Sequence, residues 1–132
     1  MASYVVGSAF ESIDQTTVIA RSTDGGRQWQ EIRPILDQSD NPHPASNYLK
    51  LTCVNKTKII AFGYEFDRSD PDLPICNPLT GGVLQSRLIW CVSEDLGRSW
   101  QAAKTINRSF QEPVEASSPL LAIDSRHWIT PI

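Results

Sequence analysis

The stretch STDGGRQWQ at residues 22–30 recurs as SEDLGRSWQ at residues 93–101. The two stretches share six of nine residues without a gap and lie 71 residues apart. Two further stretches, at residues 51–60 and 120–129, share an apolar–turn–apolar pattern at an offset of 69 residues. Two landmarks that recur at nearly the same period predict a repeat architecture.

Each period contains signals for four β-strands. Apolar and β-forming residues predict strands at 48–54, 58–64, 87–92 and 99–105, with a long polar connection at 65–85. Similar signals predict earlier strands at 3–10, 16–21 and 28–33, and later ones at 119–123 and 127–132. Four antiparallel strands in series are typical of a β-propeller blade. We therefore expect an all-β fold with a partial blade at residues 1–36, a complete blade at 37–106 and the start of another at 107–132.

The repeated motif has a mechanical explanation as a hairpin turn. Its Ser and Asp side chains can accept hydrogen bonds from turn amides, and its Gly permits the positive φ of a tight reversal. Its Trp begins the next strand, where we expect it to bury an apolar face against the neighbouring blade. The eight positions are Ser22, Asp24, Gly26 and Trp29, and Ser93, Asp95, Gly97 and Trp100.

Both copies of the motif resemble the Asp-box of the sialidase superfamily, the bacterial-neuraminidase repeat. Residues 5–29 and 118–132 also resemble segments of that family, although Asp124-Ser125 replaces its usual Asp-Gly. The resemblance implies a six-bladed propeller that binds a glycan at one end of its channel, with non-catalytic Asp-boxes at the opposite rim. Since a propeller closes with four to eight blades, the 132 residues are expected to supply about two of them.

No catalytic residue of that family is carried over onto this chain. The resemblance implies an arginine cluster, a Tyr nucleophile assisted by Glu, and an Asp acid/base. The stretch that matches the acid/base region, at residues 45–48, has no carboxylate. The remaining groups would belong to other blades.

Topology predicts that the connections at residues 37–47, 65–85 and 107–118 lie at one end, opposite the Asp-boxes. Loops on a rigid scaffold are the usual place for binding chemistry. The residues there that could face a ligand are His43, Tyr64, Glu65, Asp67, Arg68 and Glu115. Alternatively, the charged residues of the 65–85 connection simply face solvent. A site for a hard cation is a weaker alternative for the same residues. We expect no cofactor and no metal.

Two functions fit these observations. One is a scaffold portion of a sialidase-like glycoside hydrolase that removes a terminal sialic acid or a related sugar. The other is a non-catalytic Asp-box propeller that binds glycan or protein, which the missing carboxylate favours. A partial gene product without activity of its own is a third interpretation.

Net charge and hydropathy exclude some classes of binding partner. A net charge of −3 gives no basic footprint for nucleic acid, and no apolar stretch has membrane-spanning length. Open sheet edges predict self-association, or pairing with missing blades of the same parent chain. The three cysteines are expected to be reduced and mostly buried. No signal peptide is evident, so we expect a cytoplasmic protein if the chain is complete, and secretion is the alternative if its N-terminus is missing.

Overall fold

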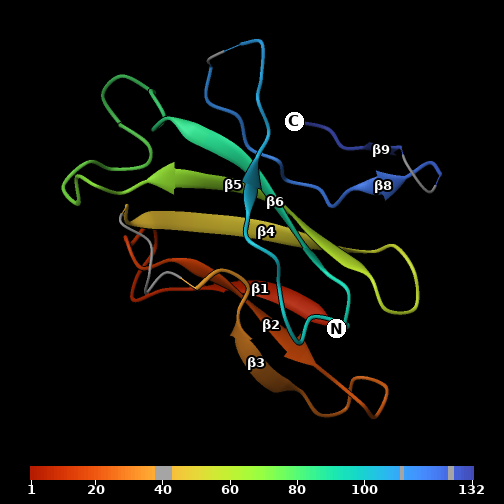
Figure 1. The fold of residues 1–132 in the computed structure, drawn as a ribbon. Helices are drawn as coiled ribbons and strands as arrows, with labels where there is room; N and C mark the ends of the chain where they lie inside the picture. Colours follow the sequence, from red (N-terminus) through yellow and green to blue (C-terminus); the bar gives the residue numbers. More distant parts are fainter. Residues whose placement is uncertain (38–42, 111, 125–126) are drawn as a thin grey trace.

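The computed structural model describes residues 1–37, 43–110, 112–124 and 127–132, and these form strands and turns but no helix. Three antiparallel sheets account for all the named strands (Figure 1). They are β1 (Ala2–Val6), β2 (Thr16–Arg21) and β3 (Gln30–Pro34) in the first sheet; β4 (Ala45–Cys53), β5 (Ile59–Asp67), β6 (Ser86–Ser93) and β7 (Lys104–Thr105) in the second; and β8 (Leu121–Ala122) and β9 (Trp128–Ile129) in the third. The all-β class predicted from the sequence is confirmed. Within the described ranges, no helix has the length and apolar character needed to span a bilayer.

Each sheet follows chain order, so every strand pairs with its neighbour in the sequence. The second sheet is the most regular, because β4 pairs with β5 over nine residues from Ala45↔Asp67 to Cys53↔Ile59. Close strand packing explains why residue 63 is a glycine, since a Cβ atom at Gly63 would lie 1.9 Å from the Tyr48 carbonyl oxygen. The division of the chain into propeller blades remains a prediction.

The strand boundaries correct several sequence-based expectations. β5 continues to Asp67, so Glu65 and Asp67 are strand residues and the connection begins only at Arg68. That connection carries a small hairpin of its own, closed by the Cys76↔Val83 bridge. β1, β7, β8 and β9 are shorter than predicted, with β7 reduced to two paired residues. Apolar composition identified these strands, but their lengths depend on pairing partners elsewhere in the fold.

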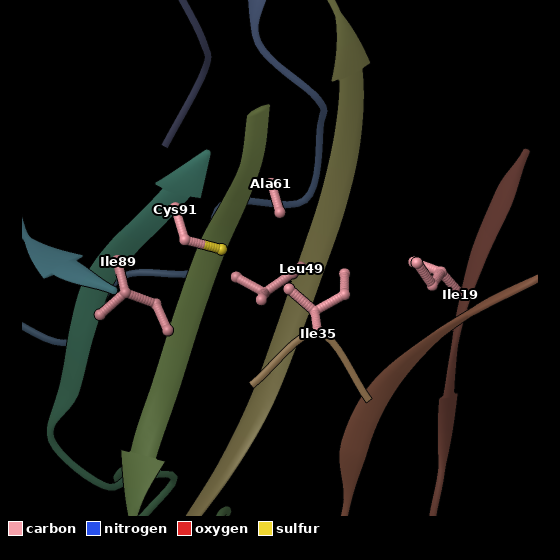
Figure 2. Close-up of a cluster of buried hydrophobic side chains, with 6 residues drawn as sticks. All are labelled: Ile19, Ile35, Leu49, Ala61, Ile89 and Cys91. Carbon is pink, nitrogen blue, oxygen red and sulfur yellow. The ribbon is translucent and has the colours of Figure 1, made fainter. Parts of the chain in front are cut away.

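A first buried cluster fills the space between the first and second sheets (Figure 2). Ile19 on β2 and Ile35 just after β3 approach from the first sheet. Successive strand residues point to opposite faces, so one face of the second sheet supplies its partners. These are Leu49, Ala61, Ile89 and Cys91, with Leu51, Leu36 and Trp100 packed around them.

A second cluster covers the opposite face of the second sheet. Phe62 and Leu88 are its largest side chains from β5 and β6, and Ala116 reaches it from the C-terminal part of the chain. Trp90 and Trp128 pack against this cluster. Both faces of the second sheet are therefore buried, each by a different part of the chain.

The cysteines differ from the expectation of mostly buried thiols. Only Cys91 is buried, while Cys53 and Cys76 are exposed, and all three are free. Cys53 ends β4 and Cys76 lies in the polar connection. The expectation was wrong for these two because cysteine burial depends on which face of an element the residue occupies, which composition alone does not give.

Candidate functional site

The first repeated motif forms a turn held by its own side chains. The Ser22 hydroxyl oxygen accepts the Gly26 amide at 2.7 Å, and Asp24 Oδ1 accepts the amides of Arg27 at 2.9 Å and Gln28 at 3.0 Å. The Gln28 amide, followed by the Ser22 hydroxyl, holds the pKa of the Asp24 carboxyl below 3.8. The carboxylate therefore stabilises the turn in its ionised form.

The second motif repeats this pattern of bonds. The Ser93 hydroxyl oxygen accepts the Gly97 amide at 2.7 Å, and Asp95 Oδ1 accepts the Ser99 amide at 2.8 Å. Leu96 has a φ of 61° where Gly25 has 75°, so the backbone conformation is kept despite the different residue. The Ser99 hydroxyl, followed by the Ser99 amide, holds the pKa of Asp95 well below its usual range.

The two motif tryptophans have different environments. Trp100 packs against the first buried cluster, between the first and second sheets. Trp29 is 49% exposed and folds back onto its own turn, where Nε1 donates to the Gly26 carbonyl at 2.9 Å. Burial against a neighbouring sheet is therefore present for Trp100, while the same expectation for Trp29 is wrong in this structure.

A second pair of turns is also equivalent. Asn55 Oδ1 accepts the Lys58 amide at 2.8 Å, and Asp124 Oδ1 accepts the His127 amide at 2.9 Å. A backbone hydrogen bond also closes each turn. The Val54 amide donates to the Lys58 carbonyl, and the Ile123 amide donates to the His127 carbonyl, both at 2.9 Å. The 69-residue repeat of the sequence is therefore also a repeat of hydrogen-bonded turns.

The end of the second sheet that carries the Asn55 turn also carries the second motif. The Leu96 amide donates to the Thr57 carbonyl at 2.9 Å, and Lys58 Nζ lies 3.0 Å from a Glu94 carboxylate oxygen. Arg21 of the first sheet donates to the Leu96 carbonyl. We refer to this as the turn end.

The opposite end gathers the longer connections, and we refer to it as the loop end. Arg68 organises it, because its amide donates to the Pro44 carbonyl at 2.8 Å while its guanidinium donates to the carbonyls of Glu11 at 3.1 Å and Leu73 at 3.2 Å. Arg68 is almost completely buried. It therefore positions three segments and presents no charge at the surface.

A second arginine fixes the remaining connection at the loop end. Arg108 donates to the carbonyls of Ser86 at 2.8 Å and Glu112 at 2.9 Å. The Ser86 hydroxyl donates to the Val114 carbonyl at 2.7 Å, and its oxygen accepts the Val114 amide at 2.9 Å. These bonds hold the segment that leads to the exposed Glu115.

Two tyrosines at the loop end form a stacked pair. Tyr48 on β4 and Tyr64 on β5 are register partners, with ring centroids 5.1 Å apart and an interplanar angle of 19°. Both are half-buried, and Phe66 packs edge-on against each. Burial, followed by the negative charge of Glu115, raises the pKa of Tyr64 to about 12. The Tyr64 phenol is therefore a neutral hydrogen-bonding group at physiological pH.

Glu65 lies on the other face of the sheet from Tyr64. Its carboxylate is paired with the Arg87 guanidinium at 2.8 Å. Burial raises the pKa of Glu65, and the charge of Arg87 opposes that shift. Strand alternation thus separates Glu65 from the tyrosine pair and places it towards the first sheet.

Asp67 and His43 are at the rim of the loop end. Asp67 Oδ1 accepts the hydroxyl of Ser69 at 2.6 Å and its amide at 2.9 Å, and these two bonds lower the pKa of Asp67. His43 is exposed, just before β4. Among the described residues, no group of three or more His, Cys, Asp or Glu side chains is arranged to hold a metal ion.

The stretch that resembles the acid/base region is structural in this chain. Ala45, Ser46 and Asn47 are fully buried at the start of β4. The Asn47 side chain accepts the Thr17 amide at 2.9 Å and donates to the Thr16 hydroxyl at 3.1 Å. Asn47 therefore joins two sheets and is inaccessible to a substrate.

Sequence reasoning missed Tyr48 and Arg87 as neighbours of the predicted residues. The signal for Tyr48 was available in principle, because pairing across a short turn centred on residues 55–58 brings Tyr48 opposite Tyr64. Arg87 follows from the same register, since it pairs with Glu65. Only the Arg87–Glu65 pair required β5 to extend beyond Tyr64.

Comparison of the chain with protein-family models, with curated proteins and with solved structures found no match. The resemblance to the sialidase superfamily therefore depends on the motif residues and their spacing alone.

Proposed function

We propose that this chain is part of an Asp-box β-propeller and that its loop end binds a glycan without catalysing a reaction. The stacked pair of Tyr48 and Tyr64 carries this proposal, because half-buried aromatic rings next to polar groups suit the apolar faces and hydroxyl groups of a sugar. The loop end supplies such polar groups in the two phenols and in Glu115, whose charge acts on both rings.

The propeller part of the proposal is supported by the matched turns. Both motifs close with a Ser hydroxyl bonded to a Gly amide at 2.7 Å; the first follows β2 of the three-stranded sheet, and the second follows β6, the third strand of the four-stranded sheet. The four-stranded order β4-β5-β6-β7 is the order expected of one blade. Its two buried faces suit a sheet that stacks between neighbours.

Binding is favoured over catalysis by the chemistry of the loop end. A phenol acts as a nucleophile through its deprotonated form, and a pKa of about 12 disfavours that form for Tyr64. The acid/base region is occupied by buried Asn47, which cannot transfer a proton to a leaving group.

The proposal is tested by titrating the folded chain with lactose and sialyllactose while ligand-observed NMR reports binding. We expect saturable binding that Tyr64→Ala weakens at least about tenfold, since stacking and a phenol hydrogen bond are both lost. Tyr4→Ala is the matched control, because Tyr4 is an exposed tyrosine on β1. The proposal would be contradicted if neither sugar bound, or if Tyr64→Ala and Tyr4→Ala lost the same amount of affinity.

A sialidase-like hydrolase is the second candidate, favoured by the proximity of a tyrosine phenol and a glutamate charge at the loop end. A fluorogenic sialoside separates the two candidates. Our proposal expects no turnover above the buffer blank. Turnover by the purified chain that is lost in Tyr64→Phe would establish the hydrolase instead.

A further inference from the structure

A cleft lies between the first and second sheets, on the face of β5 opposite the tyrosine pair. It has a volume of about 640 Å³ and is lined by residues 33–37, by Glu65 and Arg87, and by residues 100–103. We call it the inter-sheet cleft. Its volume is within the range of small-molecule sites in proteins, about 300–1,000 Å³.

Charged groups of both signs line this cleft. Glu65 is only 8% exposed, and its carboxylate is held by Arg87, which is itself half-exposed. Arg33 lines the cleft from the first sheet, and its guanidinium donates to the Arg98 carbonyl. With Asp37, the lining has two guanidinium groups and two carboxylates, so the formal charges cancel.

An indole forms part of the wall. Trp100 lines the cleft and packs against the first buried cluster, so its ring is held in place. Its Nε1 is buried without a hydrogen-bond acceptor among the described residues, whereas the equivalent Nε1 of Trp29 has one. The buried Nε1 of Trp128 and Nε of Arg68 also lack an acceptor among the described residues, so Trp100 contributes its ring to the cleft wall and not a free donor.

We propose that the inter-sheet cleft binds a neutral saccharide of one or two rings. The apolar wall of Ile35, Leu36 and Trp100 suits the C–H face of a sugar ring. Sugar hydroxyls both donate and accept, so they can bond to carboxylates and guanidinium groups together. A charged ligand gains little, because attraction to one sign in the lining is offset by repulsion from the other.

This site is separate from the tyrosine pair, because Glu65 and Tyr64 point to opposite faces of β5. The two proposals can therefore fail independently. Loss of loop-end binding leaves the cleft unchanged, and the reverse also holds.

The test is an NMR titration of the full chain with maltose, cellobiose and lactose, and with N-acetylneuraminate as the acidic probe. The reporter is the indole N–H resonance of Trp100, assigned by its disappearance in Trp100→Phe. We expect a saturable shift with at least one neutral disaccharide and a weaker one, or none, with the acid. Arg87→Gln should weaken this binding about tenfold or more, since a hydrogen bond to a charged group is lost.

Two control variants lie outside the inter-sheet cleft. Arg27→Gln changes an exposed arginine of the first motif, and Tyr64→Ala changes the loop end. Both should leave the Trp100 shift and its midpoint unchanged. No saturable shift with any neutral sugar at 100 mM (about the weakest affinity such a site would have) would overturn the proposal. Stronger binding of the acid, or equal loss in Arg87→Gln and Tyr64→Ala, would also overturn it.

Discussion

Thr17 on β2 donates two hydrogen bonds to Asn47 on β4, from the first sheet to the second. Asn47 Oδ1 accepts the Thr17 amide at 2.9 Å, and the Thr17 hydroxyl donates to the Asn47 carbonyl at 3.0 Å. The same hydroxyl oxygen accepts the Leu49 amide at 2.9 Å, and both residues are completely buried. These buried hydrogen bonds fix the position of β2 against β4 at the border of the first buried cluster.

Replacing Asn47 should therefore destabilise the whole chain. Asn47→Ala removes the acceptor of the Thr17 amide and leaves that amide buried and unsatisfied, at a cost of about 2–3 kcal/mol in the free energy of unfolding. Urea denaturation followed by tryptophan fluorescence measures the change. Asn107→Ala is the matched control, because Asn107 is exposed, and it should change stability by less than about 0.5 kcal/mol. Equal stabilities would refute the role assigned to Asn47.

The fold was more predictable from the sequence than the site. The motif residues are local, since Ser93, Asp95 and Gly97 bond within one turn, so spacing alone was sufficient to place them. The separation of Tyr64 from Glu65 needed the true end of β5, which depends on pairing with β4 and β6. Trp29 shows the same dependence, because an identical motif position is exposed in one copy and packed in the other.

The motif carboxylates should make stability depend on pH. The pKa of Asp95 is lowered in the folded chain by the Ser99 hydroxyl, so its contribution is complete above the ordinary value of 3.8. That contribution is lost as the pH falls below about 4 towards the lowered pKa. Asp95→Asn should therefore be less stable than the parent chain at pH 7, and the difference should shrink by pH 3.

Thermal unfolding monitored by circular dichroism at both pH values measures this convergence. Asp72→Asn provides the control, since Asp72 is an exposed carboxylate in the connection after β5. A difference between Asp95→Asn and the parent that is independent of pH would show that the charge of Asp95 does not support the turn.

The three thiols should react at different rates. Cys53 and Cys76 are exposed, whereas burial raises the pKa of the Cys91 thiol to about 12. With iodoacetamide at pH 8, we expect two rapid modifications and a third that appears only when urea unfolds the chain. Peptide mass spectrometry identifies the modified residues. Rapid labelling of Cys91 in the native chain would contradict the packing of the first buried cluster.

The third sheet should cause self-association. It has only two short strands, and Leu121, Ile123 and Ile129 each expose more than half of their surface. Exposed apolar surface of this kind favours association. Light scattering should give an apparent mass that rises with concentration, and Leu121→Lys combined with Ile129→Lys should reduce it. A constant monomer mass for the parent chain would refute this prediction.

The central claim is that the loop end, and not the turn end, binds a glycan. Backbone-amide NMR of the isotopically labelled chain during a titration with sialyllactose and lactose tests it most directly. We predict saturable shifts at Tyr48, Tyr64 and Glu115, with none at the turns of Ser22 and Ser93. Shifts confined to those turns, or no shifts with either sugar in the folded chain, would contradict the claim.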